Sequence, residues 1–465
     1  MSAPSTYTEP ARKVPVLGEY DVIVCGGGPA GCAAAIAAGR HGADALLVEK
    51  NGYLGGATVS QLVSVILSTN GVDFQGIWHE FAAEMDGRGA ANMPVCRGDY
   101  MYRGGFDPEV VKHVWDAMLT GAGVSILHHA LSAGAIVEEE TIGGVLVETK
   151  AGRRAIRADR VVDATGDGAV CARAGVEWEQ GAEGKPWAMA CTKAFRMGNV
   201  DWSRVERTPE TMEAARRALQ EAIDRGEFDS PVVLNERPLG YAMGTRTHLP
   251  PYRREHLSVA GRVLRVDPLD PFDLTRAERE GREQARQCAA AVTECVPGYE
   301  NAYLLDTSNH LGVRSSRRVH GIERVTDEDA LEFRKHEDGI ARSSWDIDVW
   351  PAESYDAPAV PRNDPEYKKR IERLKEGEYF DIRYGCLVAE GVDNLLMAGR
   401  CISAGHLAEA SLRIQQTCMA TGQAAGTAAA MSLEADTTPR ELDAQSVVAQ
   451  LEKDRSSVPD VLEDR

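Results

Sequence analysis

Three glycines at a fixed spacing, Gly26, Gly28 and Gly31, follow a β-branched run and open an alanine-rich stretch. Glycines in such a turn let the backbone approach a pyrophosphate, and the free amides of the following helix favour the phosphate charge. Glu49 ends the next apolar run, about 20 residues further on, where a carboxylate can bind ribose hydroxyls. The spacing predicts a site for a dinucleotide with an unphosphorylated ribose, either FAD or NAD.

A β-α-β unit has to position these residues. The pattern predicts a strand over residues 20–25, a helix over 29–40 and a second strand over 45–49. Residues 124–162 predict alternating strands with glycine turns between them. A further strand at 386–399 leads into Ala398-Gly399-Arg400. Other helices are expected at 108–120 with Asp107 as N-cap, 209–225, 275–293, 415–432 and 440–453, and residues 349–365 should be irregular because of their prolines.

Three segments resemble flavoproteins of the glutathione-reductase fold. EYDVIVCGGGPAGCAAAIAAGRHGADALLVEKNGYLGGAT, residues 19–58, is similar to their opening β-α-β unit, which binds the ADP half of FAD. VVDATGDG, ending at Gly168, resembles the internal motif that returns the chain to the FAD domain. Residues 393–426 resemble the carboxyl-terminal FAD motif, most closely that of the broad FAD-dependent oxidoreductase family related to fumarate reductases and succinate dehydrogenases, and residues 311–329 match a segment typical of that family.

This resemblance implies an α/β fold, with a glutathione-reductase-like Rossmann-type FAD-binding domain and an inserted α+β substrate domain. The FAD domain would be discontinuous. The expected boundaries are 18–75, 122–184 and 378–435 for the FAD-binding domain, 76–121 and 185–377 for the substrate or cap domain, and 436–465 for a tail helix.

The resemblance also implies that FAD is the cofactor. Succinate-dehydrogenase relatives attach their flavin through a histidine just before the glycine pair, and none precedes Gly55-Gly56, so noncovalent FAD is expected. Aromatic hydroxylases of this fold have aspartate where this chain has Arg400, which disfavours hydroxylation. The predicted cofactor-binding residues are Gly26, Gly28, Pro29, Ala30, Gly31, Glu49, Lys50, Gly55, Gly56, Ala57, Thr58, Ala164, Thr165, Gly166, Asp167, Gly399 and Arg400.

Three residues are candidates for the chemistry itself. Arg314 could clamp a substrate carboxylate or stabilise developing negative charge, and the alternative is a surface basic strand. His406 and Arg413 stand between the Ala398-Gly399-Arg400 turn and the following long helix. His406 could exchange a proton near neutral pH, and the alternative is a histidine satisfied by backbone groups. His310 and Tyr384 are weaker candidates, and tryptophans such as Trp345 and Trp350 are expected in the core or the pocket wall.

Composition limits the function further. The net charge of -19 argues against nucleic-acid binding. Ten scattered cysteines and eleven histidines show no metal-ligand spacing, so no metal is predicted. Neither a signal peptide nor a membrane span is visible, which favours a cytoplasmic enzyme with a small-molecule substrate and is compatible with a homo-oligomer.

The expected function is an FAD-dependent oxidoreductase that moves a hydride between a small organic substrate and the flavin. Two alternatives stay open at this point. An FAD-holding RNA-modification protein would share a similar glycine motif, although the acidic charge speaks against it. A plain NAD-dependent Rossmann dehydrogenase would leave the carboxyl-terminal segment without a role.

Overall fold

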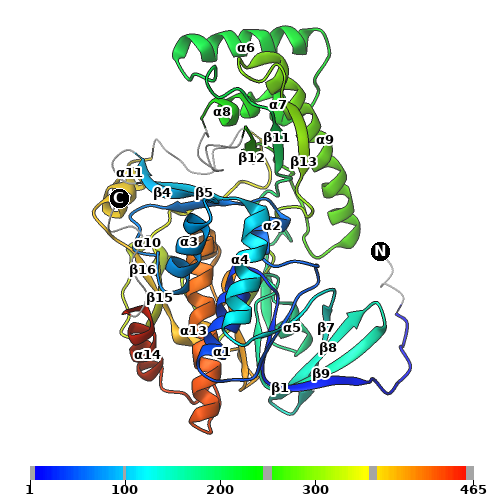
Figure 1. Ribbon diagram of the computed structural model, residues 1–465, viewed down its shortest axis with the longest axis vertical. Coiled ribbons are helices and arrows are strands. Elements are labelled where there is room, and N and C mark those ends of the chain that lie inside the picture. Colours follow the sequence, from blue (N-terminus) through cyan, green and yellow to red (C-terminus); the bar gives the residue numbers. More distant parts are fainter. Residues whose placement is uncertain (1–5, 98–100, 245–253, 356–363, 457–465) are drawn as a thin grey trace.

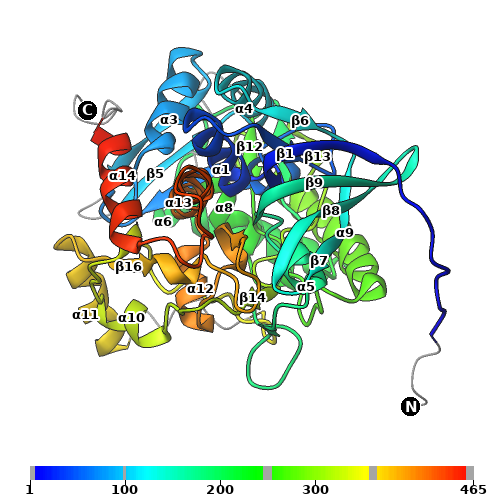
Figure 2. The ribbon, with the colours of Figure 1, turned by 90° about the horizontal axis from the view of Figure 1, so that it is seen from below.

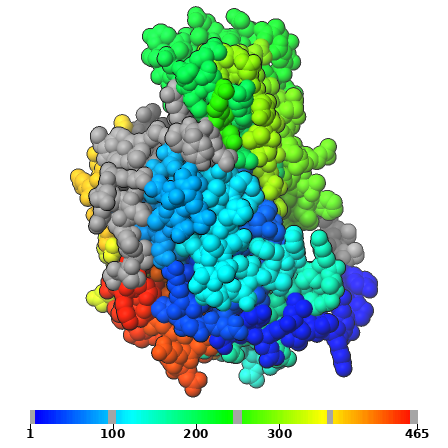
Figure 3. Space-filling model, in the orientation of Figure 1, coloured from blue at the N-terminus to red at the C-terminus, as the bar shows by residue number. Residues whose placement is uncertain are grey.

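The computed structural model describes residues 6–97, 101–244, 254–355 and 364–456. Figure 1 shows a larger body below and a smaller, mostly helical lobe above, and its element labels are used throughout. The space-filling view in Figure 3 shows the same lobe, in green, standing above the body.

A seven-stranded sheet forms the centre of the larger body. Four strands are parallel in the order β6-β2-β1-β9, and β17 pairs in parallel with the end of β9. β8 and β7 extend the sheet as antiparallel strands beside the first half of β9. The strands span Val16–Cys25 (β1), Ala45–Val48 (β2), Ser125–Leu127 (β6), Leu131–Glu138 (β7), Thr141–Thr149 (β8), Gly152–Asp163 (β9) and Leu395–Met397 (β17).

The parallel part of this sheet is apolar because both of its faces are covered. Val22 to Cys25 in β1 have no exposed surface, and the four residues of β2 are buried. Helix α1 (Pro29–Arg40) is the crossover between these two strands. Its first ten residues, Pro29 to Ala38, are all buried, which explains their small and apolar composition.

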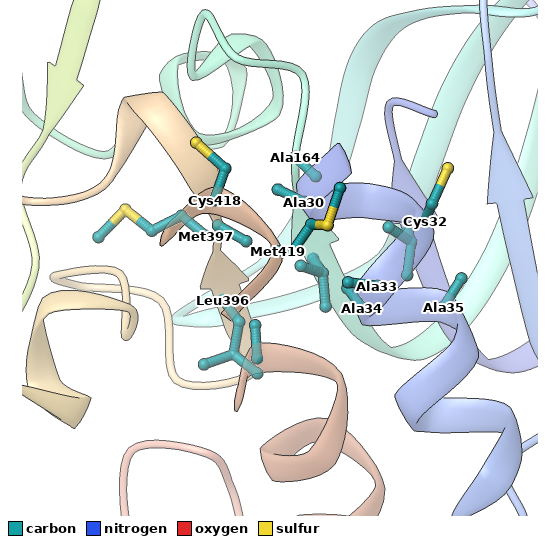
Figure 4. Packing of buried hydrophobic residues seen from close by; sticks show 14 of the residues in the cluster. Ala30, Cys32, Ala33, Ala34, Ala35, Ala164, Leu396, Met397, Cys418 and Met419 are labelled. Atoms are coloured by element: carbon teal, nitrogen blue, oxygen red, sulfur yellow. The ribbon is translucent and has the colours of Figure 1, made fainter. Parts of the chain in front are cut away.

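The long carboxyl-terminal helix α13 (Gln415–Glu434) packs directly on α1, and Figure 2 shows the two side by side. Glycines make this close approach possible. A Cβ atom at Gly422 would lie 2.0 Å from the carbonyl oxygen of Ala30, and one at Gly426 would lie 1.9 Å from that of Ala34. Figure 4 shows side chains of α1 and α13 in the common core. The two ends of the chain therefore build one domain.

The upper lobe has a hydrophobic cluster of its own, which runs from Phe195 to Ala302. A three-stranded sheet in the order β12-β11-β13 packs there with four helices. These elements are β11 (Phe195–Gly198), α6 (Pro209–Asp224), α7 (Pro231–Leu234), α8 (Arg237–Gly244), β12 (His256–Ser258), α9 (Pro271–Cys295) and β13 (Tyr303–Thr307).

The remaining elements precede or follow the lobe in the chain. Those before the lobe are α2 (Ala57–Ser60), β3 (Val65–Ser68), α3 (Ile77–Gly87), β4 (Ala91–Arg97), β5 (Met101–Phe106), α4 (Pro108–Gly121), α5 (Ala169–Arg173) and β10 (Trp178–Gln180). Those after it are β14 (Arg317–Val319), α10 (Asp327–Glu332), β15 (Gly339–Ser343), α11 (Pro365–Lys375), β16 (Phe380–Arg383), η1 (Tyr384–Cys386), η2 (Gly399–Cys401), α12 (His406–Leu412) and α14 (Ala444–Ser456).

Several predicted elements differ from those observed. β1 begins at Val16 rather than at residue 20, and α9 begins at Pro271 rather than at residue 275. The strand expected at 386–399 is a tight reversal in which only β17 joins the sheet. Gly391, with φ of 77°, lies in this reversal, and Val388 pairs back on Leu396 in antiparallel fashion. The tail helix expected at 440–453 begins at Ala444, since Asp443 accepts a hydrogen bond from the amide of Ser446.

The predicted domain boundaries stay a prediction. Residues between Ile77 and Leu119, which were expected to belong to the cap, contribute side chains to the same hydrophobic cluster as β1 and α1. No helix within the described ranges is long and apolar enough to cross a membrane.

Candidate functional site

One elongated cavity, about 1730 Å³ including its solvent-open mouth, lies where the parallel strands end. The carboxyl ends of parallel strands meet at one sheet edge, which is where α/β proteins of this type bind their ligands. The wall combines the glycine turn after β1, the loop after β9, the turn after β17 and the start of α13. The rest of the lining comes from β3 and from loops near residues 192, 312 and 348.

The glycine turn is shaped to receive a ligand. Gly26 has φ of 104°, and a Cβ there would lie 2.5 Å from the carbonyl oxygen of Ala164. Gly28 is different, because its Cβ would meet only the Cα of Gly56, at 3.8 Å, and would otherwise point into open space. The first intrahelical hydrogen bond of α1 runs from the amide of Cys32 to the carbonyl of Gly28. The amides of Ala30 and Gly31 therefore precede that ladder, as expected for an anion-binding helix start.

Glu49 closes the turn from the side of β2. Its carboxylate is buried, with 6% of the residue exposed, and accepts hydrogen bonds from the amide of Gly27 at 2.7 Å and that of Asn51 at 2.8 Å. Because each carboxylate oxygen has two lone pairs, the group can still accept bonds from a ligand. Glu49 thus orients the glycine turn and also faces the cavity.

The internal motif is held by a buried acid that the sequence analysis passed over. Asp163 accepts bonds from the amide and hydroxyl of Thr165, and its other oxygen accepts bonds from the amides of Val170 and Cys171. Asp163 has no exposed surface. It fixes the loop that carries Thr165, Gly166 and Asp167 into the cavity.

Asp167 and Arg400 form an ion pair at 2.6 Å on the cavity wall. The hydroxyl of Ser316 also donates to Asp167 at 2.7 Å, and Arg400 donates to the carbonyl of Val313 at 2.7 Å. Burial by itself would raise the pKa of Asp167, but the charge of Arg400, the Ser316 hydroxyl and the charge of Lys50 outweigh it. The pKa of Asp167 therefore lies below its ordinary value, and the carboxylate stays ionised.

A second helix, α13, begins at the cavity wall. Its N-cap, Ile414, provides no side-chain bond, and Gln415 and Gln416 line the cavity. Gln415 accepts a bond from the hydroxyl of Thr58 at 2.5 Å and donates to the carbonyl of Val63 at 2.6 Å. The positive end of a twenty-residue helix is thereby fixed at the site.

Two further guanidinium groups, those of Arg314 and Arg413, line the cavity. Arg314 lies 4.4 Å from the ring centroid of Trp350 and donates to the carbonyl of Ala190. Burial, followed by the charge of Arg413, lowers the pKa of Arg314 to about 10, so it remains a cation at neutral pH. Arg413 donates to the backbone carbonyl of Asp348 at 3.0 Å and pairs with its carboxylate at 3.3 Å.

His310 lies on the cavity wall as well. Its Nε2 is 3.0 Å from the side-chain oxygen of Asn51, and its backbone amide donates to the carbonyl of Ser60 at 2.9 Å. Burial, followed by the charge of Lys50, lowers the pKa of His310 below its ordinary value. His310 is therefore neutral at pH 7. Its two contacts hold the segment around residue 310 against Asn51 and Ser60.

The structure brings most of the residues predicted for the site to this cavity. Those that line it are Gly26, Gly28, Pro29, Ala30, Glu49, Lys50, Gly56, Ala57, Ala164, Thr165, Gly166, Asp167, Gly399, Arg400, Arg314 and Arg413. Gly31, Gly55 and Thr58 do not line the cavity, but they contact residues of the glycine turn or of the lining. The Cβ of a residue at position 31 would collide with the carbonyl of Gly26, and the amide of Gly55 donates to the carbonyl of Gly27 at 2.8 Å.

His406 and Tyr384 lie away from this wall. His406 begins α12, and burial followed by the charge of Arg318 lowers its pKa below the ordinary value. The hydroxyl of Tyr384 donates to the backbone carbonyl of Pro439 at 2.7 Å and is buried. The cavity therefore gives neither side chain direct access to a bound ligand.

Several wall residues were not predicted as site residues. Asp348 stands just before a proline-rich stretch, where no periodic pattern singles it out, and Gln415 and Gln416 were read only as the start of a helix. Trp345 and Trp350 do line the cavity, as expected of pocket-wall tryptophans. Within the described ranges, no group of three or more histidine, cysteine or acidic side chains is arranged to hold a metal.

The model of one protein family, described as FAD dependent oxidoreductase, matches residues 21–451. The chain belongs to this family, and its cofactor is therefore FAD. This settles the choice between FAD and NAD that the glycine spacing left open, and it removes the plain NAD-dependent dehydrogenase from consideration. The protein is an FAD-dependent oxidoreductase with a Rossmann-type α/β fold.

The chain is also similar to two digeranylgeranylglycerophospholipid reductases of Methanopyrus kandleri, with 32% identity over 158 and 157 residues. Each match covers 32% of this chain and only 40% or 38% of the relative. Among solved structures, a geranylgeranyl bacteriochlorophyll reductase-like protein from Thermoplasma acidophilum has 13% identity and a TM-score of 0.44, over 94% of this chain and 83% of that one. A flavin-dependent brominase has 12% identity and a TM-score of 0.43, over 93% and 84%.

Proposed function

We propose that the enzyme transfers a hydride between a small organic substrate and a noncovalently bound FAD. The observation that carries this proposal is that one cavity joins a dinucleotide cradle to a wall of charged and aromatic side chains. Gly28 and Glu49 of the cradle line this cavity together with Arg314 and Arg413. A cofactor and a substrate placed in the same cavity can react directly.

The residues present fit FAD. The amides at the start of α1, together with Lys50 and Arg400, suit the two negative charges of a pyrophosphate, and Glu49 suits ribose hydroxyls. The open space at Gly28 allows a phosphate to approach the backbone. When bound, the flavin supplies the hydride-accepting or hydride-donating centre.

The start of α13 and Arg413 would stabilise negative charge on the flavin or the substrate during the reaction. The amides at the start of α13 present the positive end of its dipole to the cavity. Arg413 adds a full positive charge beside them, and its pairing with Asp348 holds the guanidinium in place. Positive groups that are fixed before the reaction stabilise negative charge that develops during it.

The test is anaerobic reduction of the purified, flavin-loaded protein with a panel of metabolites, including alcohols, amines, organic acids and isoprenoid lipids. Hydride transfer predicts bleaching of the visible flavin absorbance by the true donor, or reoxidation of the chemically reduced protein by the true acceptor. A protein that contains no flavin after purification and after incubation with FAD would overturn the proposal.

The alternative of an FAD-holding RNA-modification protein makes a different prediction. It requires RNA to co-purify with the enzyme or to bind in a salt-dependent manner. The net charge of -19 favours the small-molecule enzyme. A nuclease-sensitive absorbance at 260 nm in the purified protein would favour the alternative.

A further inference from the structure

The wall around Arg314 and Arg413 has an excess of positive charge. These two guanidinium groups share one nearby acid, Asp348, which pairs with Arg413. In the part of the chain that the structure describes, no acid forms an ion pair with Arg314, whose side chain donates only to the carbonyl of Ala190. Arg314 is thus a cation on the cavity wall with no ion-pair partner among the described residues.

Arg314 is held in a fixed orientation. Its guanidinium lies over Trp350, at 4.4 Å from the ring centroid, and Arg262 and Arg237 lie over the same ring at 5.2 and 5.1 Å. The backbone carbonyl of Trp350 accepts a bond from the amide of Ala190 at 2.9 Å, so the ring and the arginine share one anchor. A guanidinium fixed in this way loses little further entropy when it binds a ligand.

Apolar side chains also line the cavity on whose wall Arg314 lies. Val65, Leu67, Val259 and Trp345 line the same cavity. A charged group without a partner is costly in such a place, and an anion from solution or from a substrate would offset that cost. The fork of an arginine matches the two oxygens of a carboxylate in a bidentate bond.

We propose that Arg314 is the substrate-anchoring residue and that the substrate is an organic acid, whose carboxylate binds Arg314 while its carbon skeleton lies along the apolar wall. This proposal rests on the proposed function, because it places the acid in the cavity that would also hold the flavin. Arg413, which is already paired with Asp348, is left to act on the reacting end.

The test uses flavin-loaded enzyme and matched probes. Benzoate and succinate are titrated against their neutral counterparts, benzamide and succinamide, and against inorganic phosphate. Binding is followed by perturbation of the visible flavin spectrum and, independently, by calorimetry. The variants are Arg314→Met, which removes the charge, and Arg314→Lys, which keeps the charge and loses the fork. Arg286→Met is the control, because Arg286 is an exposed side chain on α9 that pairs only with Glu283.

At least one carboxylate should bind to the wild type while its amide does not. Arg314→Met should weaken that binding by roughly tenfold to hundredfold, the range for a charged hydrogen bond, and Arg314→Lys should weaken it less. Arg286→Met should bind like the wild type. Equal binding of acid and amide, binding of phosphate alone, or unchanged affinity in Arg314→Met would overturn the proposal.

The two proposals fail in different ways. An enzyme that contains no flavin refutes the proposed function, while calorimetry still reports whether carboxylates bind at Arg314. An enzyme whose bound flavin is reduced by a donor, but whose wild type binds none of the carboxylates, refutes only the anchoring role.

Discussion

Arg400 donates a hydrogen bond to Asp167 over 2.6 Å, and this contact joins two motifs that are 233 residues apart in the chain. It lies on the wall of the cofactor cavity. The internal loop after β9 and the turn after β17 are thereby locked together at the place where the FAD would bind.

Arg400→Met should weaken FAD binding, because it removes a cation from the cradle and leaves Asp167 without its charge partner. We expect a loss of about tenfold or more, the scale of one charged hydrogen bond. Fluorescence titration of apo-protein with FAD measures it. Arg173→Met is the matched control, because Arg173 is exposed and donates only to the carbonyl of Ala169 in its own helix. Equal FAD affinities for the two variants would contradict a role for the pair.

Glu49→Ala should also weaken FAD binding, by roughly tenfold to hundredfold. The substitution removes acceptors for ribose hydroxyls and frees the amide of Gly27, which Glu49 holds at 2.7 Å. The same titration is suitable, with the exposed Glu109→Ala as control. An unchanged affinity would assign Glu49 to loop support alone.

The flavin should be released as free FAD when the purified protein is denatured with acid. The expectation follows from the absence of a histidine just before Gly55-Gly56 in the sequence. Chromatography of the supernatant after precipitation identifies the flavin. Yellow colour that stays with the precipitated polypeptide would show covalent attachment instead.

Arg413→Ala should slow flavin reduction by about two orders of magnitude, the scale for one positioned electrostatic donor. It should retain FAD, because Arg413 is not among the residues proposed to bind the ribose and the pyrophosphate. Stopped-flow reduction with the substrate found in the metabolite panel measures the rate. His406→Ala is the comparison: since His406 lies outside the cavity wall, its reduction rate should stay near that of the wild type. The reverse order of effects would return the catalytic role to His406.

Asp73 should make stability depend on pH. Burial raises its pKa to about 6, although the hydroxyls of Ser68 and Ser344 lower it. An acid with a raised pKa in the folded state lowers the free energy of unfolding as pH rises from about 4 to about 6, because the unfolded chain ionises first, and the loss is complete above that range. Asp73→Asn should therefore gain stability relative to the wild type at pH 8, by roughly 1–3 kcal/mol, and less at pH 5. Urea unfolding at the two pH values measures this, and a pH-independent difference would contradict it.

Local sequence determined the cofactor cradle. The glycines, the acid after the second strand and the alanine-rich helix form one short local pattern. The glycine turn lies between β1 and α1, and the acid follows β2, as predicted. The small residues of α13 likewise indicated a packed helix, and Gly422 and Gly426 explain its contact with α1. Such features depend on neighbours that are close in sequence or on a strongly constrained turn, so one sequence is enough to read them.

Only the tertiary structure decided which distant side chains share the cavity. Arg314, Asp348 and Arg413 come from three separate segments, and no periodicity relates them. Asp348 carried no signal, and His406, although only seven residues before Arg413, lies outside the cavity wall. The reason is physical: loops that meet across a sheet edge are positioned by the packing of whole lobes. The charges on this part of the cavity wall come from several such loops, so no single stretch of the sequence shows how they balance.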